Sequence, residues 1–288
     1  MSSRRLPDGR WEHRFRQSWL NTLSHCPEQA RAQWLGEFDE DEHTDSTALG
    51  TAVHAGIEVC LQEQADGQGP LDVDDCVEVA RMELERIGEW KYTKYPYKRV
   101  PELAEKLVTT WYDHVRPHVR PSLVEHHFSH ALHEDTKRVI LVSGTIDCVD
   151  DDLLVWDWKT GSRPYEPWEY QRWAVQPTAY TWAIAQEFEA VDRRGPWWFR
   201  YAILRTDGEV QYLKVRRGEP HVEWLRKQAL AAAELIEQGL DAWPLNDAGW
   251  WCSDKWCPKF AECKGAVMAE DWTVTEKAHE PEEAHTCS

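Results

Sequence analysis

Runs of apolar, β-branched and aromatic residues predict strands in the middle and later parts of the chain. Residues 123–132, 139–147 and 153–159 are rich in Val, Ile, Leu and Trp, which is typical of three successive strands. Two further strands are expected at 197–205 and 209–215. The intervening Thr206, Asp207 and Gly208 predict a hairpin turn between them.

Helical spacing of apolar residues is typical of several other segments. We expect helices over about 15–34, around His54, over 76–90, 101–115 and 222–238, and around Gln176. Pro101 suits a first helical turn, and Gly239 suits a helix end. Residues 269–288 contain few large apolar side chains, so an acidic, mobile tail is expected there.

Composition favours one intracellular domain. The chain has 288 residues and no evident repeat or flexible linker, and this length is compatible with a single α/β enzyme domain. Its N-terminus lacks the apolar core of a secretory signal, and no stretch is long enough to span a bilayer. We therefore expect a cytoplasmic protein that is not associated with a membrane, with its eight cysteines in a reducing compartment.

Two carboxylates and an amine lie at the ends of adjoining strand candidates. Asp147 ends one strand, and Asp157 and Lys159 lie in the next, where a side-chain period of two places them on the same face. Carboxylate oxygens suit Mg²⁺ or Mn²⁺. A lysine ammonium suits the orientation of a water or the stabilisation of charge on a phosphate. Taken alone, this pattern is more often a chance Asp-x-Lys pair on a solvated strand face.

Further segments make the sequence resemble the RecB-like branch of the PD-(D/E)XK nuclease superfamily. Thr47 to His54 resembles the first motif of that branch, and Glu125 the second. Gly144 to Asp147 and Asp157 to Lys159 resemble the next two active-site elements, and Gln176 to Tyr180 resembles the downstream Gln-x-x-x-Tyr. The resemblance implies an α/β fold with a mixed central sheet flanked by helices, like the core of restriction endonucleases.

The same resemblance implies roles for individual residues. His54, Asp147 and Asp157 would bind Mg²⁺ or Mn²⁺ together with a backbone carbonyl, and Lys159 would be the catalytic lysine. Glu125 would be a further acidic group near the metal. Gln176 and Tyr180 would share a helix face near the substrate, although Pro177 interrupts that helix.

Four cysteines give a second signal. Cys26 precedes a proline near the start of the chain, and Cys252, Cys257 and Cys263 cluster near its end. Four thiols can hold a [4Fe–4S] cluster or a zinc ion. The arrangement resembles the iron–sulfur staple of CRISPR-associated RecB-like exonucleases and of the AddB nuclease domain. The first spacing is C-x4-C where that family has C-x2-C. Iron–sulfur is preferred, and zinc is the competing assignment.

The net charge of −18 does not favour nucleic-acid binding, which usually needs a basic surface. A local basic groove remains compatible with an acidic total. Two segments are candidates for such a groove. In the first, four cationic residues are interleaved with three tyrosines, and the second is a group of arginines. Either segment could equally be an ordinary solvated surface. Their residues are Lys91, Tyr92, Lys94, Tyr95, Tyr97, Lys98 and Arg99, and Arg4, Arg5, Arg10, Arg14 and Arg16.

The resemblance therefore predicts a metal-dependent DNA nuclease, in which residues 1–268 form one domain closed by the cysteine staple. It implies exonuclease action on single strands or DNA ends, with protein partners in recombination or adaptation, and endonuclease action at a flap or junction stays open. Such a nuclease could serve CRISPR adaptation, recombination repair or viral DNA processing. Two other functions stay open. The chain could be an inactive nucleic-acid-binding accessory protein in recombination, or a zinc-stabilised interaction module.

Overall fold

The computed structural model describes residues 1–37, 43–69, 71–166, 174–188, 192, 194–239, 241–246, 249, 251–253 and 257–265. Of residues 264 and 265 it describes only the backbone. The predicted tail at 269–288 lies outside these residues. The chain divides into two compact units, residues 1–246 and 247–288. Among the described residues of the second unit, Ala261–Gly265 form a short π-helix, η2.

The first unit holds the following helices and strands in chain order: β1 (Ser2–Arg5), β2 (Trp11–Arg16), α1 (Gln17–His25), α2 (Pro27–Trp34), α3 (Asp45–Ala65), α4 (Val73–Ile87), α5 (Arg99–His114), the 3₁₀ turn η1 (Arg116–His118), β3 (Pro121–Glu134), β4 (Arg138–Asp150), β5 (Val155–Gly161), α7 (Val175–Glu187), β6 (Trp197–Arg205), β7 (Val210–Arg217) and α8 (Glu219–Gln238).

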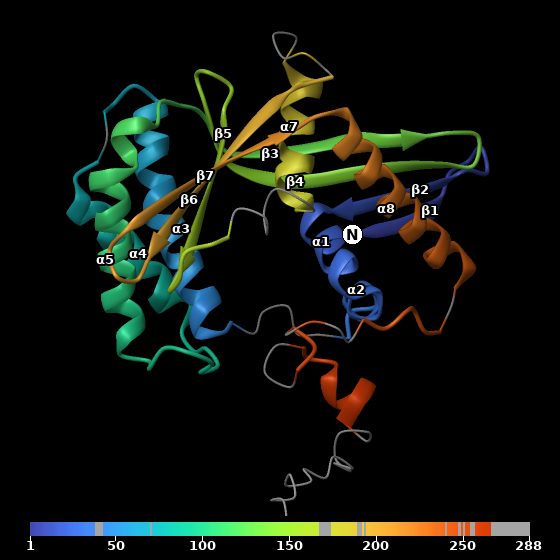
Figure 1. Ribbon diagram of the computed structural model, residues 1–288, viewed down its shortest axis with the longest axis horizontal. Coiled ribbons are helices and arrows are strands. Elements are labelled where there is room, and N and C mark those ends of the chain that lie inside the picture. The colour runs from blue at the N-terminus through green and yellow to red at the C-terminus, as the bar shows by residue number, and fades with distance from the viewer. Residues whose placement is uncertain are drawn as a thin grey trace, which may run out of the picture. The chain divides into compact units, whose positions relative to one another are not determined.

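The described strands form one mixed seven-stranded sheet, which confirms the predicted α/β fold class. Its order is β1-β2-β4-β5-β6-β7, and β3 pairs with β4. The β2–β4 and β5–β6 pairs are parallel, and the remaining pairs are antiparallel. Helices cover both faces. Figure 1 shows α3, α4 and α5 gathered beside β5–β7, with α1, α7 and α8 beside the other strands.

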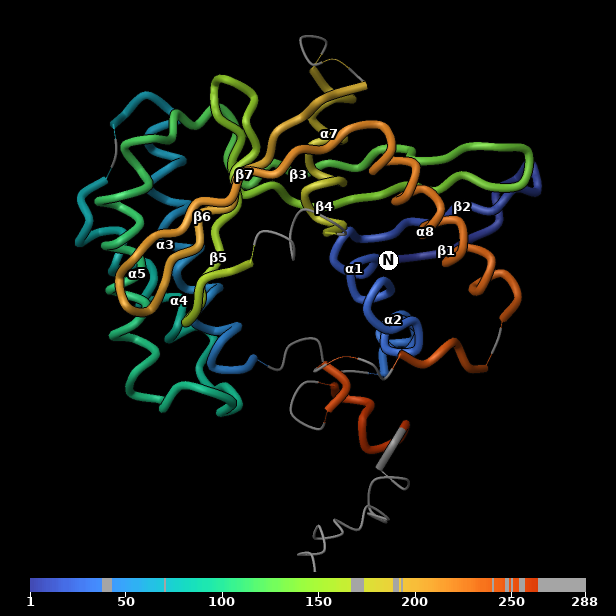
Figure 2. Tube along the Cα trace, in the orientation of Figure 1, coloured from blue at the N-terminus to red at the C-terminus, as the bar shows by residue number. Residues whose placement is uncertain are grey.

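Strand alternation separates two hydrophobic cores. Val155 belongs to a core shared with α1, α7 and α8, whereas Trp156 and Trp158 belong to one shared with α3, α4 and α5. Trp111 of α5 packs edge-on against Trp158, with ring centroids 5.7 Å apart. Figure 2 traces this second layer, with α3 and α5 beside β5, β6 and β7. The odd-numbered residues of β5 therefore face away from the α3–α5 layer.

The predicted strands, the hairpin at residues 206–208 and the helix closed by Gly239 are confirmed. The N-terminal prediction is wrong in part. A helix was expected from about residue 15, but β2 extends to Arg16, and the helical region is divided at Cys26. His13 and Phe15 are buried while Arg14 and Arg16 are exposed. This period of two identifies a strand, which pairs with β4 far along the chain.

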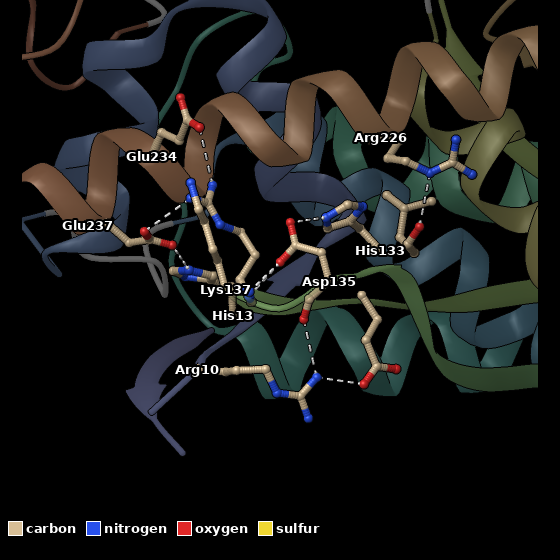
Figure 3. A network of polar contacts seen from close by, with 11 residues as sticks. Arg10, His13, His133, Asp135, Lys137, Arg226, Glu234 and Glu237 are labelled. Carbon is tan, nitrogen blue, oxygen red and sulfur yellow. Dashed lines mark hydrogen bonds and ion pairs between the residues drawn. The ribbon is translucent and has the colours of Figure 1, made fainter. Parts of the chain in front are cut away.

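A polar network joins this N-terminal strand to α8. His13 is buried, and its Nε2 lies 2.8 Å from Oε1 of Glu237. Since a carboxylate only accepts, Nε2 donates, and Nδ1 can accept from the Ser3 hydroxyl. Figure 3 shows Glu237 and Glu234 of α8 on one side of the network and Asp135 of the β3–β4 turn on the other. The network fixes β1 and β2 against α8, so the chain enters α1 from a defined position.

Candidate active site

The candidate site lies at an interruption in the pairing of β4. One edge of β4 pairs with β3 along most of its length. The other edge pairs with β2 over residues 138–143 and with β5 only at residues 148–149. Residues 144–147 therefore have no strand on that edge, and Asp147 lies at the end of this gap. Polar side chains from several elements take the place of the missing strand.

Asp157 and Lys159 form an ion pair on the face of β5 opposite Trp156 and Trp158. Asp157 Oδ2 lies 2.5 Å from Lys159 Nζ, and its Oδ1 accepts a hydrogen bond of 2.7 Å from Gln176 Nε2. Asp157 is fully buried, whereas 31% of the Lys159 side chain is exposed. The lysine head is thus held beside a buried carboxylate and remains accessible.

The charges of this pair influence one another. Burial raises the pKa of Asp157 above its ordinary range, and repulsion from Asp147 adds to this, while Lys159 opposes it. Burial alone would lower the pKa of Lys159, but Asp157 and Asp147 outweigh burial and raise that pKa. Lys159 is therefore a protonated amine in the site.

His54 of α3 contacts both β5 and β4. Its Nε2 lies 2.9 Å from the carbonyl oxygen of Trp158, and its Nδ1 lies 3.5 Å from Asp147 Oδ2. A carbonyl only accepts, so Nε2 carries the hydrogen. In the neutral ring the Nδ1 lone pair then faces a carboxylate oxygen without a proton between them. Two electron-pair donors in this relation suit a cation.

Two glutamates add negative charge to the same site. Glu125 of β3 lies in a left-handed conformation with φ +48°, at the position opposite Asp147 in the β3–β4 register. Burial raises the pKa of Glu125 to about 7, with contributions from Asp147, Glu58 and Asp157. Glu58 follows His54 by one helical turn on α3. The sequence analysis did not identify it, although its spacing from His54 places both on one helix face.

Gln176 and Tyr180 share a face of α7, as their spacing predicts. The Tyr180 hydroxyl lies 3.4 Å from Gln176 Nε2 and 3.4 Å from Nε2 of Gln17. Pro177 does not interrupt the helix, because α7 begins at Val175 and Pro177 lies in its first turn, where backbone N–H groups have no helical partner. Burial raises the pKa of Tyr180, with contributions from Asp157 and Asp147. Gln17 was missed because it was assigned to the interior of a longer helix.

The donor set can be compared with the needs of a divalent cation. Two carboxylates, an imidazole nitrogen and the Trp158 carbonyl lie together, and the surrounding acids outnumber the one lysine. This excess of negative charge in a buried site suits Mg²⁺ or Mn²⁺. In the described parts of the chain, however, no group of three His, Cys, Asp or Glu side chains is arranged to hold a metal ion. Asp157 instead contacts Gln176 and Lys159.

The four cysteines assigned to a cluster fall in different units. Cys26 lies between α1 and α2 of the first unit, where the backbone is extended and the helix axis changes. Cys252, Cys257 and Cys263 lie in the second unit, and all four are partly buried. The iron–sulfur and zinc assignments stay predictions.

One predicted basic segment lies beside β5. Asp45, at the start of α3, accepts hydrogen bonds from the backbone N–H groups of Thr93, Lys94 and Tyr95 at 2.6–2.8 Å. Lys94 Nζ donates to the hydroxyl of Ser162, which follows β5, at 2.6 Å. This places Lys94 near the strand that carries Lys159.

The N-terminal arginines make a weaker candidate surface. Arg4 and Arg14 both pair with Glu12, at 2.8 and 2.9 Å, and Arg10 pairs with Asp8 and Glu134. These carboxylates neutralise much of the local positive charge. The β1–β2 hairpin is therefore a paired surface rather than a cationic groove.

Comparisons with known proteins identify the family of the chain. The model of the PD-(D/E)XK nuclease superfamily matches residues 14–264, a range that includes His54, Glu125, Asp147, Asp157, Lys159, Gln176 and Tyr180. A comparison with curated proteins gives no significant match.

Similar chains are found among solved structures, including the following two. A protein from Eubacterium rectale, named as a candidate exonuclease, has a TM-score of 0.53 at 9% sequence identity, covering 93% of this chain and 91% of its own. The structure of SSO0001 has a TM-score of 0.37 at 12% identity, covering 76% and 97%. At such identity the first likeness concerns the fold alone. In the described residues, no helix has the length and apolar character needed to cross a membrane.

Proposed function

Because the chain belongs to the PD-(D/E)XK nuclease superfamily, we propose that it is a divalent-metal-dependent DNA nuclease of the RecB-like branch. It would act on single strands or DNA ends, in recombination repair, CRISPR adaptation or viral DNA processing. The observation that carries the proposal is the meeting of Asp157 and Lys159 with Asp147 and His54 beside the gap in β4. These residue types from separate elements match the chemistry of phosphodiester hydrolysis.

Each side chain has a task in the proposed reaction. A divalent cation held by His54, Asp147 and Asp157 would polarise the phosphate and help to generate hydroxide from water. The Lys159 ammonium stabilises negative charge that develops on the phosphate oxygens. The water oxygen bonds to phosphorus as the P–O ester bond breaks, and the leaving oxygen takes up a proton. The products are a phosphate monoester and a hydroxyl end.

The surrounding groups position these residues. Gln176 donates to Oδ1 of Asp157 and so fixes the carboxylate that faces Lys159. Tyr180 and Gln17 extend this polar contact toward α1. Glu125, whose pKa is raised to about 7, is a neighbouring acid that can hold or release a proton near neutral pH. Lys94 is proposed to contact the substrate backbone beside β5.

A structural [4Fe–4S] cluster is the second part of the proposal. Cys26, Cys252, Cys257 and Cys263 would hold it, and their number and spacing along the sequence are its support. Iron, sulfide and zinc analysis of anaerobically purified protein tests this assignment. Loss of bound iron in Cys257→Ala is expected; bound zinc without iron would assign the thiols to zinc.

The nuclease proposal is tested with end-labelled single-stranded, duplex and circular DNA, with Mg²⁺, with Mn²⁺ and with a chelator. Cleavage that needs the cation is expected. Lys159→Met removes the amine while nearly keeping its length, and should reduce the cleavage rate on the order of 100- to 1,000-fold. Lys137→Met makes the same change at an exposed turn position and should cleave normally.

The outcomes separate the alternatives. Undiminished cleavage by folded Lys159→Met would remove Lys159 from the reaction. Tight DNA binding without cleavage under any metal condition would favour an inactive accessory protein. Cleavage of circular as well as linear DNA would replace the exonuclease proposal with an endonuclease.

A further inference from the structure

A row of cations and aromatic rings lies on the sheet face opposite Asp157 and Lys159. In the β6–β7 pairing, Trp198 faces Arg216, Arg200 faces Lys214, and Ala202 faces Tyr212. Paired residues share a face, and Arg200 also pairs with Trp156 of β5. We call Trp198, Arg200, Tyr212, Lys214 and Arg216 the β6–β7 surface.

The helical layer does not cover this surface. Trp158, Ala202 and Leu204 are buried under the α3–α5 layer, whereas Trp198 and Tyr212 are each 42% exposed. The Tyr212 hydroxyl donates to the carbonyl oxygen of His114, the last residue of α5, at 2.8 Å. This contact lies at the C-terminal end of α5. The part of the β6–β7 hairpin that carries Trp198, Arg200 and Lys214 extends past that end.

The charges on this surface repel one another. Arg200 and Lys214 stand directly opposite across the two strands, an arrangement that destabilises a hairpin. Arg216 follows on the same face. Within the described chain, none of these three cations forms an ion pair, although the sequence has 51 Asp and Glu against 33 Lys and Arg. An anionic ligand would relieve this repulsion. If these cations were ordinary surface residues, we would expect some of the many acidic side chains of this protein to pair with them.

Nearby acids are already engaged. Asp152 pairs with Arg120 at 2.9 Å, and Asp150 accepts a hydrogen bond from Trp156 Nε1 at 3.0 Å. Both line a cavity of about 660 Å³ that also touches Trp198, Arg200 and Lys214. Asp192 also lines the cavity and accepts a hydrogen bond of 2.8 Å from the backbone N–H of Arg194. Among the described residues, the positive charge without an acidic partner therefore lies on the hairpin side of the cavity.

The aromatic rings are arranged for stacking. Lys214 Nζ lies 4.5 Å from the ring centroid of Trp198, and Arg200 Cζ lies 4.7 Å from that of Trp156. Because Trp198 is 42% exposed, part of its ring is accessible to a nucleobase. Cations interleaved with exposed aromatic rings are the surface that single-stranded nucleic acids bind.

We propose that the β6–β7 surface binds a single-stranded segment of nucleic acid outside the cleavage site. Arg200, Lys214 and Arg216 contact its phosphates, and one base stacks on Trp198. The identification of the ligand rests on the proposed nuclease function. The surface gives a chain of net charge −18 a local positive field for a polyanion, on the face opposite the carboxylates.

Binding and cleavage are measured separately to test this. Anisotropy of labelled single-stranded DNA of about 30 nucleotides reports binding to full-length protein in a Lys159→Met background, over a range of salt concentrations. Lys214→Glu and Trp198→Ala are compared with Lys227→Glu, which makes the same charge change at an exposed position of α8. Cleavage of the same strand and of an oligonucleotide of about 4 nucleotides is measured with Lys159 intact.

Lys214→Glu should weaken binding of the long strand and lower the salt slope by about 0.7. Trp198→Ala should weaken binding about 5- to 150-fold, the effect of losing one stacked base. Both variants should cleave the short oligonucleotide normally, and Lys227→Glu should behave as wild type. Binding unchanged in both variants, or weakened equally by Lys227→Glu, would overturn the proposal.

The two proposals fail in different ways. If wild type cleaves nothing but Lys214→Glu and Trp198→Ala still weaken binding, the nuclease function fails and the surface stands. If the long strand is cleaved and bound equally by all variants, the nuclease function stands and the surface does not.

Discussion

Asp45 joins the start of α3, which carries His54, to the basic segment near β5, and its charge should be measurable in the stability of the protein. The carboxylate is buried and accepts hydrogen bonds from the backbone N–H of Thr93, Lys94 and Tyr95 and from the Thr93 hydroxyl. Burial alone would raise the pKa of Asp45, but these hydrogen bonds outweigh burial and lower it from 3.8 to about 2.

This pKa shift gives both the magnitude and the pH range. A group with a lowered folded-state pKa stabilises the protein above its unfolded-state pKa, and this stabilisation is lost as pH falls through the folded-state value. At 1.36 kcal/mol per pKa unit, the shift corresponds to about 2.5 kcal/mol. The contribution is complete above about pH 4 and should decline by about 1.4 kcal/mol per pH unit toward about pH 2.

Asp45→Asn removes the charge and keeps the size of the side chain. We expect its free energy of unfolding in urea to fall by about 2.5 kcal/mol near neutral pH, and its difference from wild type to shrink below about pH 4. Asp113→Asn, an exposed position in the last turn of α5, should change stability by less than about 0.5 kcal/mol. Hydrogen exchange should also accelerate at the amides of residues 93–95.

Equal stability of Asp45→Asn and wild type at neutral pH would refute the reasoning. So would a difference that is the same at all pH values, because it would arise from packing rather than from the charge.

Three further predictions concern packing, positioning and pH. Gly56→Ala should lose about 3 kcal/mol of stability, because its Cβ would lie 2.6 Å from the carbonyl oxygen of Cys76. Gly50→Ala on the same helix makes only an ordinary contact and should lose none. Equal stabilities of the two variants in denaturant titrations would contradict this. Gln176→Leu should lower cleavage about 10- to 100-fold, since it releases Asp157. It also leaves the buried Asp157 Oδ1 without this donor, so stability should fall by about 1–3 kcal/mol. Unaltered cleavage by the folded variant would exclude the positioning role of Gln176. Burial lowers the pKa of His13 from its ordinary value of 6.5, so the folded protein resists protonation of this ring and loses stability as pH falls below that value. In urea titrations His13→Gln should lose less stability than wild type over this pH range. An identical pH profile would show that His13 does not cause the loss.

Local pattern identified most of the elements that carry the site. The alternation in β5 placed Asp157 and Lys159 on one face and the tryptophans on the other, as the structure has them. The turn residues 206–208 located the β6–β7 hairpin. Such features depend on residues close in sequence, whose backbone preferences and side-chain period act before any distant contact forms.

Long-range pairing decided the rest. The β2 strand was missed because its partner β4 lies more than a hundred residues away, and Gln17 entered the site only through the turn from that strand into α1. Of the described tryptophans, Trp198 alone is exposed, which no spacing in a chain of 18 tryptophans could indicate.

The sequence by itself determined which residue types could perform phosphodiester chemistry and on which strand face they lie, because alternation is local. Only the tertiary structure decided that one edge of β4 is left unpaired beside Asp147, and that His54 contacts Asp147 while Gln176 contacts Asp157. It also decided that α5 ends beside Tyr212 and leaves the rest of the β6–β7 surface uncovered. These features depend on the lengths and packing of elements far apart in the chain. Contacts between residues distant in sequence leave no periodic signal in the sequence.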